Sequence, residues 1–139
     1  MRTIQTSSEE ETSDAGRGLA AELGVGDVLL IDGPLGAGKT AFVRGIAEGL
    51  GADPGDVSSP TFTILQQYGG SPPLYHADLY RLSPAEAADL GLEETGVDGV
   101  LAVEWPDRWA ARPSSAVAID IEDLGGDDRR ISVRRYSTR

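Results

Sequence analysis

The stretch Gly33-Pro34-Leu35-Gly36-Ala37-Gly38-Lys39-Thr40 decides the fold of this 139-residue chain. It fits the pattern G-x-x-x-x-G-K-S/T, in which glycines let the backbone turn tightly so that successive N–H groups point into one concavity. Lys39 can then reach the outer phosphates of a nucleoside triphosphate, and the Thr40 hydroxyl can ligate magnesium. The stretch therefore predicts a phosphate-binding loop (P-loop) for ATP with Mg²⁺. The predicted cofactor-binding residues of the loop are Leu35, Gly36, Ala37, Gly38, Lys39, Thr40 and Ala41.

The flanking sequence has the pattern of a parallel α/β sheet. Residues 27–32 contain a continuous apolar run, typical of a strand covered on both faces. From Lys39 to about Leu50 apolar residues recur at helical spacing, and Gly51 is a natural stop. Similar patterns predict an edge strand at 2–6, a helix opened by a Ser8–Glu11 capping box and running to about Leu23, strands at 61–68, 74–80 and 100–104, a short helix at 84–90, and a terminal hairpin of 117–121 and 131–136.

These elements predict one α/β domain over residues 1–139. We expect a three-layer fold like that of P-loop NTPases, with a mostly parallel central sheet and antiparallel strands added at the edge. The order of a buried strand, a glycine-rich loop and an amphipathic helix supports this fold, because the helix N-terminus adds a positive dipole end at the loop.

The composition excludes several classes of protein. The formal net charge is −11, and such a surface repels phosphate backbones, so no direct stable nucleic-acid binding is expected. There is no cysteine, hence no disulfide framework. Residues 2–14 are too polar for a signal peptide, and the longest apolar run, Val28 to Ile31, is too short to span a membrane. A cytoplasmic location is therefore expected. Lys39 is the only lysine in the chain.

Two acidic residues stand where a P-loop protein needs carboxylates. Asp78 follows the apolar segment that begins at Leu74, and Glu104 ends the run 100–104. Ligands of open α/β sheets bind at the carboxyl ends of strands, so both are candidates for holding magnesium or positioning water. A solvated strand-end acid is the alternative for each. Between the P-loop helix and these strands, a hydroxyl of Ser59-Pro60-Thr61 can sense the γ-phosphate, although such residues beside proline usually only form turns.

Two aromatic residues flank these acids. His76 is the only histidine, and its place near Asp78 allows proton transfer, but a packed and hydrogen-bonded imidazole is the more frequent role. Trp105 directly follows Glu104. Its ring either stacks on a base or a partner, or it caps the edge of the sheet.

Five segments follow one another along nearly the whole chain: Gly36-Ala37-Gly38-Lys39-Thr40, Ser59-Pro60-Thr61-Phe62-Thr63, His76-Ala77-Asp78-Leu79-Tyr80-Arg81-Leu82, Leu90-Gly91-Leu92-Glu93 and Val103-Glu104-Trp105-Pro106. In this set and order the chain resembles the TsaE (YjeE) family of small bacterial P-loop ATPases, which take part in making threonylcarbamoyladenosine in tRNA. Many proteins share the P-loop alone, whereas the ordered set is specific.

The resemblance implies a role for each matching residue. Thr40 and Glu104 match the magnesium-associated positions, Asp78 matches a position tied to ATP hydrolysis, and Ser59 to Phe62 match a switch-like loop near the γ-phosphate. Thr12 matches a region near the nucleotide base. The implied catalytic set is Lys39, Thr61, Asp78 and Glu104.

The resemblance also implies partners, and the chain differs from the family pattern at two positions. The family works with TsaD and TsaB, and its ATPase cycle supports turnover of that complex without itself transferring the threonylcarbamoyl group. Pro34 stands where aspartate is common, and Ala41 stands where threonine is common. Neither departure undermines nucleotide binding, but both leave the hydrolysis rate open.

Two other functions use the same loop. A small-molecule kinase needs an acceptor pocket and usually an arginine-bearing lid, whereas Arg129, Arg130, Arg134 and Arg135 fall in the predicted hairpin. A GTPase would need an N-K-x-D segment, and Lys39 is the only lysine. The kinase therefore stays as the alternative to an ATPase, and this GTPase motif is excluded.

Overall fold

A computed structural model describes residues 2–53 and 65–135 of the chain. They contain one seven-stranded sheet in the order β1-β7-β6-β2-β5-β4-β3. The strands are β1 (Arg2–Thr6), β2 (Val28–Asp32), β3 (Leu65–Tyr68), β4 (Leu74–Asp78), β5 (Val100–Glu104), β6 (Val117–Gly125) and β7 (Asp128–Arg135). The central strands β6, β2, β5 and β4 are parallel. Strand β3 pairs antiparallel with β4, β7 pairs antiparallel with β6, and β1 pairs antiparallel with β7. The predicted α/β fold is confirmed, with antiparallel strands at both edges.

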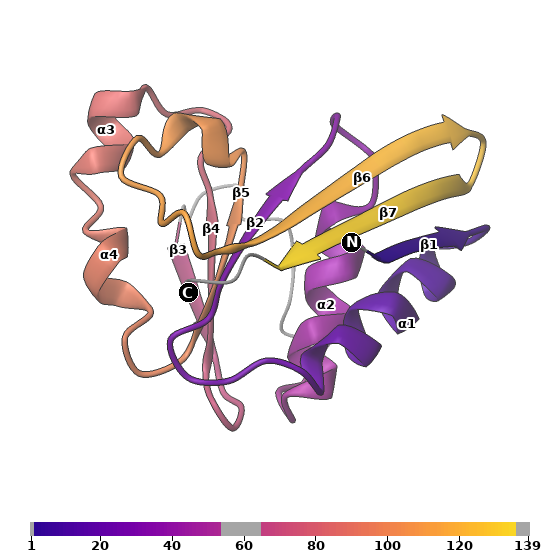
Figure 1. Cartoon of the computed structure of the whole chain (residues 1–139), viewed down its shortest axis with the longest axis horizontal. Helices are drawn as coiled ribbons and strands as arrows, with labels where there is room; N and C mark the ends of the chain where they lie inside the picture. Colours follow the sequence, from indigo (N-terminus) through magenta and orange to yellow (C-terminus); the bar gives the residue numbers. More distant parts are fainter. Residues whose placement is uncertain (1, 54–64, 136–139) are drawn as a thin grey trace.

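Helices cover both faces of this sheet (Figure 1). Helices α1 (Glu9–Ala20) and α2 (Lys39–Gly49) lie on one face, and α3 (Pro84–Ala88), α4 (Leu92–Thr95) and the 3₁₀ turn η2 (Pro106–Arg108) lie on the other. Strand β5 shows the two layers of core most clearly. Val100 and Ala102 belong to the apolar cluster beneath α1 and α2, whereas Leu101 and Val103 belong to the opposite cluster. A continuous apolar run is what a strand covered on both faces requires.

Helix α2 follows its prediction closely. The expected inward side chains are all buried, namely Phe42, Val43, Ile46, Ala47 and Leu50. The helix ends in a Schellman motif: Gly51 has a φ of +89°, and the N–H of Ala52 donates to the carbonyl of Ala47 at 2.9 Å. A glycine suits this left-handed position because it has no Cβ.

Glycines let α1 approach α2 very closely. A Cβ placed on Gly45 would collide with the backbone carbonyl of Ser13, and one placed on Gly16 would collide with the carbonyl of Phe42. This close approach brings α1 against the start of α2. The methyl group of Thr12 consequently lies beside Gly38, where an added Cβ would be 3.4 Å away.

Several predicted boundaries differ from the structure. The strand predicted at 74–80 ends at Asp78, whose carboxylate accepts a hydrogen bond from the Tyr80 N–H at 3.0 Å and so turns the chain. The guanidinium of Arg108 then donates to the carbonyl of Tyr80 at 2.6 Å. These side-chain contacts compete with the sheet ladder, and the second comes from a residue distant in sequence.

The other differences concern the ends of elements. The helix predicted at 84–90 ends at Ala88, and the short helix α4 was not predicted. Helix α1 ends at Ala20 in tight turns, and Ser8 caps it, but Glu11 accepts from the N–H of Ser7 rather than from Ser8, so the predicted capping box is incomplete. The terminal hairpin is confirmed with longer strands. The predicted strand segment 61–64 and residue 136 lie outside the described residues. None of the described helices is both long and apolar enough to cross a membrane.

Candidate nucleotide-binding site

The predicted P-loop joins the carboxyl end of β2 to the first turn of α2. Three of its glycines have positive φ: +154° at Gly33, +78° at Gly36 and +99° at Gly38. Left-handed backbone of this kind favours glycine and lets a loop fold around an anion. The first N–H groups of α2 have no partner inside the helix, and the helix dipole adds positive charge there. The backbone of the loop is therefore compatible with the predicted phosphate site, and binding of an anion stays a prediction.

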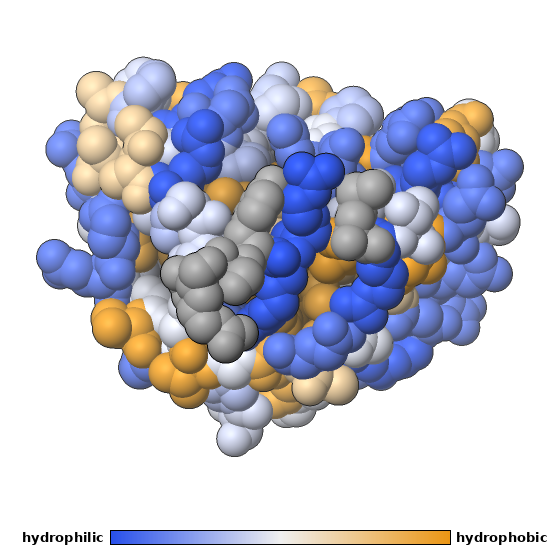
Figure 2. Space-filling model, viewed as in Figure 1, coloured by the Kyte–Doolittle hydropathy of each residue, from blue (hydrophilic) through white to orange (hydrophobic). Residues whose placement is uncertain are grey.

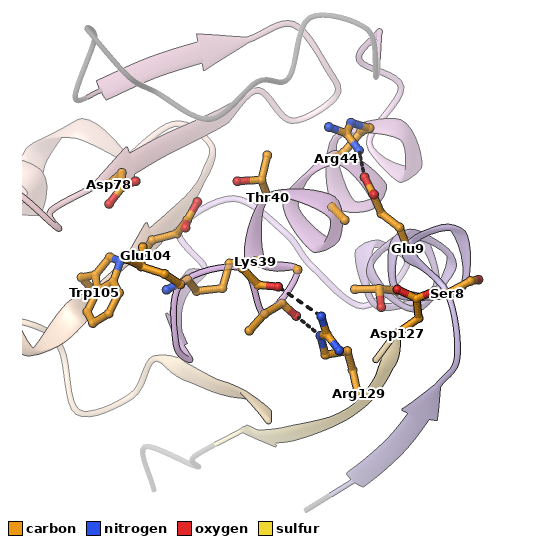
Figure 3. Close-up of a pocket in the computed structure, with 16 residues that line it drawn as sticks. Ser8, Glu9, Lys39, Thr40, Arg44, Asp78, Glu104, Trp105, Asp127 and Arg129 are labelled. Atoms are coloured by element: carbon orange, nitrogen blue, oxygen red, sulfur yellow. Dashed lines mark hydrogen bonds and ion pairs between the residues drawn. The ribbon is translucent and has the colours of Figure 1, made fainter. Parts of the chain in front are cut away.

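A cavity of about 330 Å³ lies over this loop. It is lined by Ser8, Glu9, Thr12, Leu35, Gly36, Ala37, Gly38, Lys39, Thr40, Ala41, Arg44, Asp78, Glu104, Trp105, Asp127 and Arg129. The structure thus brings every described candidate residue to one cavity, from α1, the P-loop, β4 and the end of β5. Figure 3 shows Thr40, Asp78 and Glu104 turned toward the same space. Thr61 and the loop Ser59 to Phe62 lie outside the described residues.

Lys39 is buried within the site, with only 5% of its surface exposed. Its ammonium donates to the carbonyl of Gly33 at 2.6 Å and lies 3.9 Å from the centre of the Trp105 ring. Burial lowers the pKa of Lys39, while the carboxylates of Glu104 and Asp78 oppose that shift. A desolvated cation of this kind gains more from a bound anion than an exposed one does.

Glu104 is held by a buried partner. The Nε2 atom of His76 lies 2.6 Å from Oε2 of Glu104, and both side chains are almost fully inaccessible. The other ring nitrogen of His76, Nδ1, has no hydrogen-bond partner among the described residues. His76 is thus the packed, hydrogen-bonded imidazole that the sequence favoured, and it fixes the orientation of Glu104.

Asp78 ends β4 directly beside Glu104, its register partner on β5. Burial raises the pKa of the Asp78 carboxyl, the hydrogen bond from the Tyr80 N–H opposes the rise, and the charge of Glu104 adds to it. Two carboxylates on neighbouring strand ends favour the binding of a cation between or near them, because each disfavours ionisation of the other.

Thr12 reaches the cavity from α1 but faces it through its methyl group. Its hydroxyl forms a hydrogen bond of 2.8 Å with the hydroxyl of Thr6. Only 2% of Thr12 is exposed. The prediction that Thr12 lies near the nucleotide site agrees with this position, while contact with a base stays a prediction.

Trp105 occupies an unusual backbone conformation at the cavity rim. Its φ of +58° makes it the one residue other than glycine with positive φ in the described parts of the chain. The centre of its ring lies 3.9 Å from the Lys39 ammonium and 4.9 Å from the centre of the Tyr80 ring. Such backbone strain persists only where the surroundings impose it. Of the two alternatives, the structure shows a packed aromatic at the sheet edge, and stacking on a base or partner stays a prediction.

The donor atoms at this cavity fit a magnesium ion. The Thr40 hydroxyl and the Glu104 carboxylate supply oxygen ligands, which Mg²⁺ prefers, and it usually takes one or two carboxylates together with substrate phosphates. Across residues 2–53 and 65–135, no group of three or more histidine or acidic side chains is placed to hold a metal ion.

The chain was then compared with known proteins. The sequence profile described as threonylcarbamoyl adenosine biosynthesis protein TsaE matches residues 6–131. The chain belongs to the TsaE family. The family takes part in the biosynthesis of threonylcarbamoyladenosine in tRNA, and the resemblance seen in the ordered sequence segments is therefore confirmed.

Individual TsaE proteins are similar over nearly their whole length. The TsaE of Bacillus subtilis is 43% identical over 138 residues, which are 97% of this chain and 86% of the relative. The TsaE of Treponema pallidum is 39% identical over 136 residues, covering 96% and 99%. The crystal structure of Bacillus subtilis YdiB matches with a TM-score of 0.81 at 37% identity, covering 98% of this chain and 86% of that one.

Sequence reasoning missed several residues that line the cavity of this TsaE-family chain. Arg129 comes from β7 and contacts the carbonyls of Gly36 and Ala37. Arg44 and Glu9 form an ion pair of 3.2 Å between α2 and α1. Nothing in the local pattern of a hairpin arginine indicates contact with a loop more than 90 residues away. Glu9 and Arg44, by contrast, were recognisable as charges at the start of α1 and along α2.

A second, apolar cavity was not predicted either. It measures about 240 Å³ and includes Val28, Leu92, Val97, Leu101 and Trp109 in its lining. Val28 and Leu101 lie toward the amino ends of their strands, so this cavity is at the opposite end of the sheet from the P-loop. Figure 2 shows apolar surface here, over the loops before β2 and after α4.

Proposed function

We propose that this chain binds ATP with Mg²⁺, hydrolyses the ATP, and thereby supports the TsaD–TsaB complex in forming threonylcarbamoyladenosine in tRNA. The observation that carries the proposal is the convergence of Lys39, Thr40, Asp78 and Glu104 on one cavity at the carboxyl ends of parallel strands. Ligands bind at this edge in open α/β sheets. The role of the relatives in threonylcarbamoyladenosine biosynthesis supplies the biological context.

The chain's own residues divide the work of binding. Loop N–H groups and Lys39 hold the phosphates, so Lys39 leaves its contact with the Gly33 carbonyl when a triphosphate enters. Thr40 and Glu104 would hold the magnesium ion, which when bound neutralises charge on the phosphates. His76 engages Oε2 of Glu104, so Oε1 would be the oxygen without this contact that could bind the metal ion.

Asp78 is the candidate for positioning water in hydrolysis. Its side chain faces the cavity beside Glu104, and partial burial raises the pKa of its carboxyl. A group of this kind can orient a water or accept its proton. Weak hydrolysis in isolation and stimulation by TsaD–TsaB are expected, as the resemblance to the family implies.

The test measures ATP binding and hydrolysis by the unaltered chain and by Lys39→Ala, alone and with TsaD–TsaB. We expect slow hydrolysis that the partners stimulate, and loss of ATP binding by at least about 100-fold in Lys39→Ala because the desolvated charge that meets the phosphates is gone. Unchanged affinity in this variant would refute the P-loop assignment. Arg130→Ala, which removes an exposed ion pair with Glu122, serves as the control.

The same assay separates the ATPase from the alternative kinase. A panel of small hydroxyl-bearing acceptors is added in place of TsaD–TsaB, and phosphorylated products are measured. Phosphorylation of an acceptor together with faster ATP consumption would overturn the ATPase proposal. Stimulation by TsaD–TsaB without a phosphorylated small product would support it.

A further inference from the structure

Arg129 joins the β6–β7 hairpin to the outer side of the P-loop. Its Nε atom donates to the carbonyl of Ala37 at 3.0 Å, and its Nη2 atom donates to the carbonyl of Gly36 at 3.2 Å. Figure 3 shows these two bonds side by side at the edge of the cavity. The guanidinium is a planar fork, so it can bind two adjacent carbonyls at once.

The same side chain is anchored to its own hairpin. Its Nη1 atom lies 2.8 Å from the carbonyl of Gly126, 2.8 Å from that of Asp128, and 3.2 Å from the carboxylate of Asp123. Only 14% of the Arg129 side chain is exposed. The guanidinium is thus committed to protein oxygens and holds a fixed position, so it acts on a ligand only through the loop.

The bonds to Gly36 and Ala37 have a consequence for the loop's N–H groups. The carbonyl and N–H of one peptide group point in opposite directions. The Ala37 carbonyl shares its peptide group with the Gly38 N–H, so a carbonyl held outward by Arg129 leaves that N–H directed away from Arg129. A carbonyl turned into the cavity would instead repel a phosphate.

Such a restraint matters because the peptide groups concerned are flanked by glycines. Gly36 and Gly38 both have positive φ, and glycine changes backbone conformation at little steric cost. The loop itself supplies one weak restraint here, a hydrogen bond of 3.2 Å from the Ala37 N–H to the Pro34 carbonyl. An external group is therefore needed to select one orientation.

A separate contact shows that the hairpin lies against the start of the loop as well. A Cβ placed on Gly33 would lie 2.6 Å from the carbonyl of Ile121 on β6. The loop therefore rests on β6 at Gly33 and on Arg129 of β7 at Gly36 and Ala37. The β6–β7 hairpin therefore packs against the P-loop.

We propose that Arg129 is a positioning residue that holds the Gly36 and Ala37 peptide groups of the P-loop in the orientation that binds a triphosphate. This inference rests on the proposed function, since it concerns the same site. Arg129 does not itself touch the nucleotide; it acts through the backbone that does.

The test compares Arg129→Ala and Arg129→Lys with a matched control. Arg130 is the next residue on β7, and its guanidinium forms an exposed ion pair of 3.2 Å with Glu122. Arg130→Ala therefore removes the same charge from the same strand without touching the loop. For each chain, thermal unfolding, the Kd for ATP with Mg²⁺, and the KM and kcat of hydrolysis are measured.

We expect Arg129→Ala to raise the Kd and the KM for ATP about tenfold, because two charge-assisted hydrogen bonds to the loop are lost, while kcat changes little. Arg129→Lys, which keeps the charge but cannot fork, should show a smaller loss of about threefold. Arg130→Ala should bind ATP as the unaltered chain does. Millimolar methylguanidinium should restore part of the affinity of Arg129→Ala.

Equal ATP affinity in Arg129→Ala, Arg130→Ala and the unaltered chain would overturn the inference and leave the proposed function intact. If the loss of ATP affinity in Arg129→Ala only matches a smaller folded fraction, the inference is also overturned. Arg129→Lys is the milder change, so the same comparison of ATP affinity can be made in that variant. No ATP binding by the unaltered chain would overturn the proposed function, and this inference with it.

Discussion

At the scale of single residues, the buried pair of His76 and Glu104 is the most constrained feature of the site. A hydrogen bond of 2.6 Å joins them where water has almost no access. A buried carboxylate without a partner is costly, so the imidazole both stabilises the fold and orients Glu104. One residue pair therefore serves the core and the cavity together.

Replacing His76 separates these two roles. We expect His76→Leu to lower the free energy of unfolding by about 2 kcal/mol, because the Glu104 carboxylate loses its donor. His76→Gln can place an amide N–H near the position of Nε2 and should recover part of that loss. Urea unfolding measures the stability, and magnesium titration of ATP binding measures the effect on Glu104. Equal stability in the two variants would contradict this role.

Replacing Asp78 tests its role in ATP hydrolysis. We expect Asp78→Asn to slow hydrolysis by about 100-fold while ATP affinity changes much less, because a neutral amide cannot accept a proton from water. Asp107→Asn, whose carboxylate is 63% exposed, is the control. Loss of ATP binding with unchanged turnover would contradict this assignment.

The pH dependence of stability tests the environment of Asp78. Burial raises its pKa above the ordinary value of 3.8, so the folded chain holds this proton more tightly than the unfolded chain does. The free energy of unfolding therefore falls as pH rises from about 3.8 through the raised pKa. Asp78→Asn does not suffer this loss, and its stability relative to the unaltered chain should increase over that pH range. Urea unfolding at a series of pH values checks the sign.

At the scale of elements, the close approach of α1 to α2 depends on glycines. Gly45 lies against the backbone of Ser13, with no room for a Cβ, whereas Gly18 on α1 has open space around it. Helix propensity favours alanine over glycine at both positions. Whether alanine stabilises or destabilises the fold therefore depends on the space around each glycine.

The two glycines form a matched pair for experiment. Gly45→Ala should destabilise the fold by about 2 kcal/mol, since the backbones of α1 and α2 must separate. Gly18→Ala should stabilise it by about 0.7 kcal/mol through helix propensity and reduced freedom of the unfolded chain. Thermal or urea unfolding measures both. A shift of the same sign in the two variants would show that the close packing is not a real constraint.

At the scale of the whole molecule, a protein with a negative net charge is expected to bind a negatively charged ligand. The net charge of −11 opposes the approach of ATP, so attraction has to be local. Lys39 and Arg44 line the cavity, and the amino end of α2 adds its dipole. Bound magnesium would lower the negative charge of the nucleotide, so we expect the magnesium complex to be the favoured ligand.

Binding to this cavity should stabilise the entire fold. At a 100-fold excess of free ligand over its Kd, a ligand that binds only the folded chain adds about 2.7 kcal/mol. For a domain of this size, that corresponds to a rise in Tm of roughly 8 °C with ATP and Mg²⁺. Lys39→Ala should show no such rise at the same concentrations. Equal rises in the two chains would place the nucleotide elsewhere on the molecule.

The sequence by itself determined what is local. The P-loop, the apolar run of β2, the helix α2 with its glycine stop and the terminal hairpin all follow from patterns a few residues long, because turns and helices depend on near neighbours. The sequence also marked Asp78 and Glu104 as candidates, since each ends an apolar strand, and the structure places both at the cavity.

Only the tertiary structure decided what depends on distant neighbours. β4 ends at Asp78 partly because Arg108 binds the turn that follows, Arg129 reaches the P-loop from the far hairpin, and Lys39 lies against Trp105. No short pattern encodes these contacts, because each depends on how the strands are ordered in the sheet. The predicted phosphate-binding loop is recognisable in eight residues, whereas the β6–β7 hairpin packs against it only once the sheet has formed.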